Sequence, residues 1–343
     1  MQNSKIDRVV WVDYMKVWCI SLMVFAHALP HEILLKLIYA FHMPALFLVS
    51  GFLYRPRSPK RLITSFFIPI LLYTLIYQCY LIVGTAVFEK TLPGANDLVD
   101  RLLHLWQPLF ITNDDSYITP HTGVWFLITL IMIRLIAGDV VGSSTWIMKY
   151  KYHFIVLTSG GLTVLSILNP LLLEELNNWH WFKVLPCMSF FLMGIVFKEH
   201  SNRLLSLRPS MLIVLFLFYA AIALSNERVD LYGGAFGNDF FLIFANALIA
   251  ILLFSNIFNR YGRKNHYIEV LSSGTFLILG MHSLVVETIS VVERKILMVT
   301  SPYVMTLGAL IATCVTLLCC YWLIVWAEKH FPYLLGKSAA RVK

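Results

Sequence analysis

Four histidines lie inside long apolar stretches of the sequence or at the start of one. An imidazole has an ordinary pKa of about 6.5, so it can gain and lose a proton near neutral pH. It is therefore suited to take a proton from a reacting hydroxyl group. An ionisable side chain is costly in apolar surroundings, and for that reason it is a candidate functional residue. The four candidates are His27, His42, His121 and His282.

The first apolar stretch places three ionisable residues on one helical face. His27 follows Lys16 by 11 residues and Asp13 by 14 residues. At about 100° per residue, both intervals come within about 40° of whole turns. The helical rise puts Lys16 about 16 Å and Asp13 about 21 Å from His27 along the axis. Asp13 is therefore too distant to orient the imidazole, although it is spaced to pair with Lys16.

This shared face is predicted to line a cavity or a neighbouring helix, because three ionisable groups cannot all face lipid. Each residue also has a simpler interpretation. Lys16 would reach the inner membrane surface by extending its side chain. His27 would be a water-exposed histidine at the outer surface.

The second apolar stretch combines a proline, a small-residue pair and a basic run. Pro44 removes a backbone donor, which predicts a kink. Ser50 and Gly51 permit close approach of another helix. His42 lies at a depth similar to that of His27, so the two histidines are expected to face each other across a hairpin closed by residues 30–37. The basic run contains Arg55, Arg57, Lys60 and Arg61, which also serve as a topology signal.

Two later stretches repeat this arrangement. His121 and Trp125 open one stretch, and Arg134 lies in its inner half. His282 lies in the outer half of the other. Imidazoles thus gather at one depth and cations at another. Each residue taken alone also has a simpler explanation, either as a hydrogen-bonded buried histidine or as an arginine whose side chain extends to the membrane interface.

Composition decides what kind of chain positions these residues. Of the 343 residues, 59% are hydrophobic and only 13% are charged, and the mean hydropathy is +0.74. A soluble domain carries about 25% charged residues, so the chain is predicted to be a membrane protein. The six cysteines lie in apolar stretches without a CxxC pair, which indicates neither disulfides nor a metal site. The net charge of +8 is assigned to loops beside the lipid bilayer, and nucleic acid is excluded as a partner.

We expect an all-α polytopic protein with about ten transmembrane helices in a single domain, residues 1–343. Each helix needs about 20 apolar residues. The expected spans are 9–29, 38–54, 62–88, 123–140, 153–173, 182–197, 211–225, 239–257, 270–290 and 303–327. Cytoplasmic loops are enriched in Lys and Arg. With the N-terminus inside, cytoplasmic segments hold 18 of these residues and outer segments hold 7, which predicts that both termini are cytoplasmic.

These motifs, in this order, give the chain a likeness to a known family. It resembles the acyltransferase type 3 family of bacterial integral-membrane acyltransferases, which includes O-acetylases of surface polysaccharides. The family's opening motif matches Arg8, Asp13, Lys16 and His27, with lysine where the family usually has arginine. Its second-span motif matches Pro44, Phe47, Ser50, Gly51 and Phe52, and the basic run follows. Its later motifs match Trp125, Phe126 and Leu127, and then Ser273 and His282.

The resemblance implies an acyltransferase of the bacterial cytoplasmic (inner) membrane. The donor would be a cytoplasmic acyl-CoA, most simply acetyl-CoA, although succinyl-CoA is open. The acceptor would be a hydroxyl of a surface glycan or of its lipid-linked sugar precursor. No metal is implied. His27 would act as a base or become acylated, with His42 and His282 as further catalytic candidates.

The resemblance also divides the remaining candidates into two groups. The CoA phosphates would be bound by Lys16, Arg55, Arg57, Lys60, Arg61 and Arg134. The site would be lined by Asp13, Pro44, Ser50, Gly51, His121, Trp125 and Ser273. The alternative function is a transporter or flippase for a glycan or lipid precursor, without covalent chemistry.

Overall fold

The computed structural model describes residues 8–56, 59–88, 124–139, 149–169, 171–172, 176, 180–231, 235–236, 240–292 and 301–337. The helices are α1 Val10–Ala28, α2 Glu32–Tyr39, α3 His42–Phe52, α4 Pro59–Phe88, α6 Val124–Arg134, α8 Lys151–Leu168, α10 His180–Glu199, α11 Ser201–Leu204, α12 Pro209–Ser225, α13 Phe240–Tyr261, α14 His266–Ser273, α15 Thr275–Val291 and α16 Pro302–His330. A π-helical turn, Leu135–Asp139, follows α6, and a 3₁₀ turn, Pro332–Leu335, follows α16. Strands β1, Val229–Asp230, and β2, Ala235–Phe236, pair antiparallel with Val229 opposite Phe236.

The fold is helical, as predicted, and each of the ten expected spans contains a helix. By length and composition, four stretches of the described chain are able to cross a membrane. They are Glu32–Phe52, Lys60–Gly84, Phe240–Tyr261 and Pro302–His330. The pair α14 and α15 makes a fifth if it is counted as one span. The expected number of about ten spans stays a prediction.

Two expected spans differ in form from the prediction. Residues 270–290 are not one straight helix, because α14 and α15 meet at an angle of 84°. The segment 30–37, predicted as a connecting loop, contains most of α2. A turn at Ala40–Phe41 separates α2 from α3, so the break precedes Pro44 instead of lying at it. Pro44 lies in the first turn of α3, where its missing N–H costs no helical hydrogen bond.

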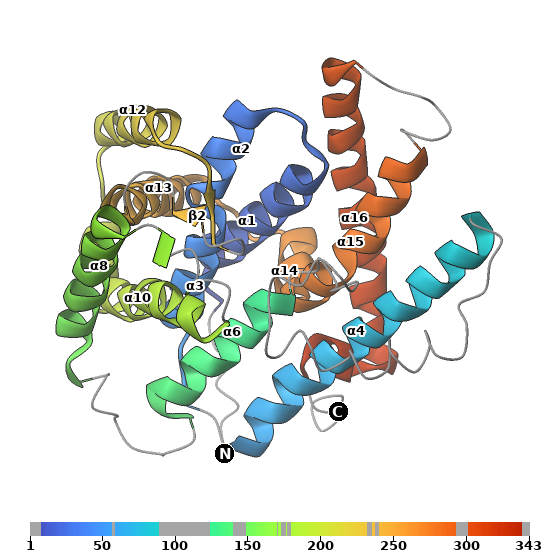
Figure 1. The fold of residues 1–343 in the computed structure, drawn as a ribbon. Coiled ribbons are helices and arrows are strands. Elements are labelled where there is room, and N and C mark those ends of the chain that lie inside the picture. Colours follow the sequence, from blue (N-terminus) through green and yellow to red (C-terminus); the bar gives the residue numbers. More distant parts are fainter. Residues whose placement is uncertain are drawn as a thin grey trace.

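Helix α1 lies in the middle of the bundle (Figure 1) and contacts α3, α13, α14, α15 and α16. Its apolar side chains are buried on several sides, including Met15, Cys19, Ile20 and Val24, each fully or almost fully buried. Antiparallel packing on α3 places Trp11 against Phe52, with ring centroids 4.9 Å apart. The first helix of the chain is therefore the core around which the others assemble.

Helices α3 and α10 cross closely because each presents a glycine to the other. A Cβ atom at Gly51 would overlap the backbone carbonyl of Phe191. A Cβ atom at Gly194 would overlap the carbonyl of Leu48. The close approach predicted from Ser50 and Gly51 is thus confirmed at Gly51, and small residues are the usual means of such packing in membranes.

Large apolar side chains cover the outer surfaces of the peripheral helices. On α8, α12 and α16 they include Leu157, Phe218, Leu307 and Trp322, all more than half exposed. A water-soluble protein does not expose continuous apolar surface of this kind. These faces suit contact with the acyl chains of a lipid bilayer.

Candidate active site

An imidazole cluster lies at one end of α1. The rings of His27 and His282 have centroids 5.0 Å apart. His27 is in the last turn of α1, and His282 is in the middle of α15. His27 also interacts electrostatically with both His282 and His42. The structure thus brings His27 and His282 into ring contact, which the sequence did not predict, and it places His42 within electrostatic range of His27.

The two flanking histidines are buried, whereas His27 is exposed. His42 is 3% exposed and His282 is 0% exposed. The Nδ1 atom of His42 is 2.8 Å from the carbonyl oxygen of Ile38. Because a carbonyl only accepts, Nδ1 carries the hydrogen and Nε2 is left as an acceptor. His27 is thus the exposed imidazole of the three.

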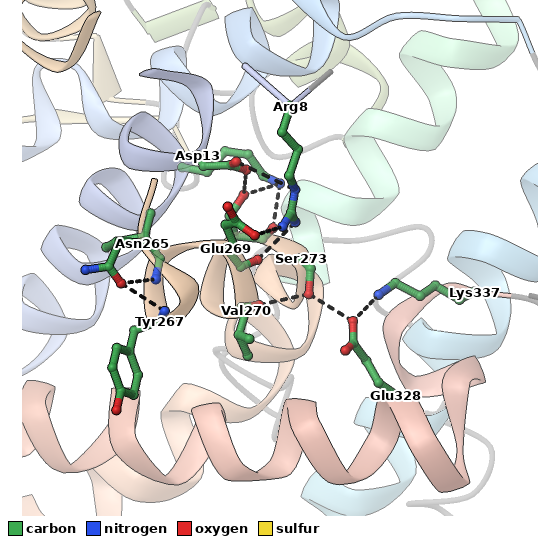
Figure 2. A network of polar contacts seen from close by, with 12 residues as sticks. Arg8, Asp13, Asn265, Tyr267, Glu269, Val270, Ser273, Glu328 and Lys337 are labelled. Atoms are coloured by element: carbon green, nitrogen blue, oxygen red, sulfur yellow. Dashed lines mark hydrogen bonds and ion pairs between the residues drawn. The ribbon is translucent and has the colours of Figure 1, made fainter. Parts of the chain in front are cut away.

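A polar network occupies the other end of α1, where it meets α14 (Figure 2). The Lys16 ammonium donates to the carbonyl oxygen of Ser272 at 2.5 Å and contacts its Oγ at 3.1 Å. The same Ser272 hydroxyl donates to Asp13 at 2.5 Å. Arg8 pairs with Glu269 at 2.9 Å and lies 3.7 Å from Asp13. Asp13 and Lys16 are therefore joined through Ser272 in addition to their spacing on α1.

The network continues to the end of α16. Ser273 donates to Val270 at 2.9 Å and to Glu328 at 3.2 Å. Lys337 pairs with Glu328 (Figure 2). Ser273 thus lines the network at this end and not the imidazole cluster. Arg8 and Lys337 lie on the same network, so the two ends of the described chain are on one side of the bundle.

Two contacts fix α1 against α14 and α15. Lys16 contacts Ser272, and 11 residues later His27 contacts His282, which is 10 residues beyond Ser272. All three ionisable residues of α1 therefore face the same neighbouring chain segment, as predicted from their spacing. The unbroken α1 separates the two contacts by about 16 Å.

Arg134 and the basic run meet at the end of α3. The buried Arg134 side chain donates to the backbone oxygen of Arg55 at 2.9 Å and lies over the Tyr54 ring at 5.2 Å. The side chains of Arg55, Lys60 and Arg61 are exposed. Phe52 and Trp11 pack at the same end of the α1–α3 pair, away from His42. The predicted separation of cations from imidazoles is thus present along α3.

Of the remaining predicted residues, two lie in or against α3 and two lie outside the part of the chain that the structure describes. Trp125 lies beside Phe47, with ring centroids 6.2 Å apart, and so it packs on the middle of α3. Ser50 donates to the carbonyl of Leu46 within α3. His121 and Arg57 lie outside the described residues, and their roles stay predictions.

Sequence reasoning missed Ser272 and Glu269. Neither position had a signal as strong as a charge inside an apolar span, because Ser272 is a small polar residue and Glu269 precedes the predicted span 270–290. Their partners lie about 260 positions earlier in the chain. Among the described residues, no group of three or more His, Cys, Asp or Glu side chains is arranged to hold a metal ion.

The Ser272 bridge leads to a stability prediction. Ser272→Ala should lower the free energy of unfolding by about 1–3 kcal/mol, because the buried Asp13 loses the hydroxyl that donates to it, whereas Lys16 keeps the Ser272 carbonyl. Ser21→Ala is the matched control, since its hydroxyl donates only to Val17 within α1. Thermal unfolding of the purified protein in lipid would measure both. Equal stability of the two variants would contradict the bridge.

Comparison with the curated proteins and with the solved structures gives no match. A family model described as an acyltransferase domain matches residues 9–325. The match runs from the start of α1 into α16, so it includes the imidazole cluster and, from the polar network, Asp13, Lys16 and Ser272. The chain therefore belongs to this acyltransferase family.

Proposed function

We propose that this protein is a membrane O-acyltransferase that transfers acetyl from cytoplasmic acetyl-CoA to a hydroxyl of a cell-surface polysaccharide or its lipid-linked precursor. It would do so in the bacterial cytoplasmic membrane, with both termini in the cytoplasm. The observation that carries the proposal is the imidazole cluster, in which the exposed His27 lies against the buried His282 and within electrostatic range of the buried His42. The family supports acyl transfer, and the apolar outer faces support a membrane location.

The donor would approach from the end of the bundle that carries the cations. The exposed Arg55, Lys60 and Arg61 are able to bind CoA phosphates, and Arg57 lies between them in sequence. Lys16 and Arg134 are hydrogen-bonded to Ser272 and to the Arg55 backbone, so they would add charge from within the bundle. The extended pantetheine arm is comparable in length to the separation of about 16 Å between Lys16 and His27.

His27 would supply the proton transfer. The acceptor oxygen bonds to the acyl carbon and the C–S bond of the thioester breaks. The hydroxyl proton passes to the neutral imidazole of His27 and then to the departing CoA thiolate, so the products are an ester and free CoA. A general base of this kind typically contributes about 100- to 10,000-fold to the rate.

A transporter or flippase is the second candidate, and the break between α14 and α15 is the observation that favours it. Transporters often place substrate sites at discontinuous helices. In this chain, however, the break packs against Asp13, Lys16 and Ile324. It is therefore filled by the protein's own side chains.

One assay separates the two functions. The purified protein in lipid vesicles is given acetyl-CoA and de-esterified surface polysaccharide from the bacterium that carries the gene. We expect release of one free CoA thiol for each acetyl group gained by the polysaccharide, measured by mass spectrometry. Succinyl-CoA as donor tests the choice of acyl group. Movement of glycan across the vesicle membrane without consumption of either donor would establish the transporter instead.

A further inference from the structure

The His282 side chain has an unusual environment for a buried histidine. It is 0% exposed, yet its Nε2 atom has no hydrogen-bond partner among the residues that the structure describes. A buried polar atom without a partner is uncommon in folded proteins, because its lost hydration is not replaced. Such an atom calls for an explanation in terms of function.

The other ring nitrogen fixes which tautomer His282 adopts. Nδ1 lies 3.1 Å from the carbonyl oxygen of Ile278 and 2.9 Å from that of Leu279. Both carbonyls belong to α15, and both only accept hydrogen bonds. Nδ1 must therefore carry the hydrogen, and Nε2 must present a lone pair. His282 is held as a hydrogen-bond acceptor.

The ring that lies against the His282 ring is that of His27. Their ring centroids are 5.0 Å apart. Each ring nitrogen lies about 1.1 Å from its centroid, so two nitrogens that point at each other would be about 2.8 Å apart, a normal hydrogen-bond length. The rings are tilted by 39° and no bond joins them in this structure, so the bond requires the exposed His27 ring to turn. Catalytic hydrogen bonds often tighten in this way only when substrate is bound.

We propose that His282 Nε2 accepts the N–H of His27 and so positions the catalytic imidazole. The inference rests on the proposed function. With one His27 nitrogen donating to His282, the other presents its lone pair to the acceptor hydroxyl. When His27 takes the hydroxyl proton, both its nitrogens carry hydrogen, and the N–H directed at His282 stabilises the positive ring. The proton taken from the hydroxyl then passes from His27 to the CoA thiolate. The N–H shared with His282 stays on His27, and His282 keeps its tautomer throughout. A base oriented by a third group is the general arrangement of an activated catalytic pair.

The two amide replacements of histidine provide the test. In His282→Gln, the side-chain oxygen reaches the position of Nε2, whereas in His282→Asn it reaches only that of Nδ1. We expect the Gln variant to keep kcat for acetyl transfer to the polysaccharide within about 10-fold of the parent protein. The Asn variant should lose about 100-fold, since most of the His27 contribution depends on its orientation. KM for acetyl-CoA should not change in either variant.

His42→Gln and His42→Asn are the matched controls, because His42 is also buried beside His27 with Nδ1 on a helix carbonyl. We expect these two variants to differ little from each other. Equal kcat values for His282→Gln and His282→Asn, whether high or low, would overturn the proposal. So would a change confined to KM. If the unaltered protein transfers no acetyl group, the proposed function itself fails.

A measurement on the unaltered protein covers the case in which the variants do not fold. Nitrogen NMR of histidine-labelled protein in lipid distinguishes the two neutral tautomers. His282 is expected to carry its hydrogen on Nδ1 and to show a hydrogen-bonded Nε2. A hydrogen on Nε2 would overturn the proposal independently of any activity.

Discussion

Replacement of His27 by alanine should reduce acyl transfer by about 100- to 10,000-fold, the usual contribution of a general base. His27 is the exposed member of the imidazole cluster and lies beside His282. Binding of acetyl-CoA should be unchanged, because Lys16, the cation on α1, lies about 16 Å away along the helix. His27→Gln should be equally inactive, since an amide cannot take the proton. Acetyl transfer to de-esterified polysaccharide and equilibrium binding of CoA measure the two effects.

His31→Ala is the control for the His27 variant. His31 also lies at this end of the bundle, but its ring faces Tyr303 at 6.3 Å. It should keep near-normal activity. If His27→Ala retained most of its activity while His282→Ala lost it, the base would be His282. If His42→Ala, His27→Ala and His282→Ala were all active, the imidazole cluster would be structural.

Gly194→Ala should destabilise the protein by about 3 kcal/mol, the upper part of the range for overpacking. The added Cβ would overlap the carbonyl oxygen of Leu48 in α3. Because this obstacle is backbone, no rotamer change relieves it, and α3 and α10 must move apart. Gly51→Ala should behave alike, since its Cβ would meet the carbonyl of Phe191. Thermal unfolding in lipid or detergent measures the loss.

Gly160→Ala provides the matched control in a helix of the same bundle. A Cβ at Gly160 meets nothing within 4 Å. Alanine favours a helix over glycine by up to about 1 kcal/mol, so this variant should be neutral or slightly more stable. Equal effects of Gly160→Ala and Gly194→Ala would show that helix propensity, and not close packing, determines the result.

Much of the site was predictable because helical geometry is regular. The spacing of Asp13, Lys16 and His27 determines their shared face wherever the chain is helical. The hairpin of the first two spans brought His42 toward His27. Close packing at Gly51 followed from the absence of a side chain. These predictions depended only on short distances along the sequence.

Other features depended on contacts between distant segments. The bend at Gly274 occurs where α16 passes, since a Cβ at that position would overlap Ile324. The close approach of Ile324 favours glycine there, and Ser273-Gly274 was a turn signal that the apolar pattern of 270–290 masked. Similarly, Ser272 acquires its role only from Asp13 and Lys16 on α1. The hydropathy of a segment predicts that it is buried, but it does not predict which other segment packs against it.

The central position of α1 has a consequence for the order of assembly during synthesis. During synthesis this helix leaves the ribosome about 260 residues before Glu269 and Ser272, the partners of Arg8, Asp13 and Lys16. Until then, the charges of α1 have no partners from α14. Since charges without partners are costly in a bilayer, α1 is poorly suited to settle alone in lipid. Synthesis of α14 therefore completes the polar contacts of α1, and a chain that ends before α14 would keep the Arg8–Asp13 pair but leave Asp13 and Lys16 without Ser272.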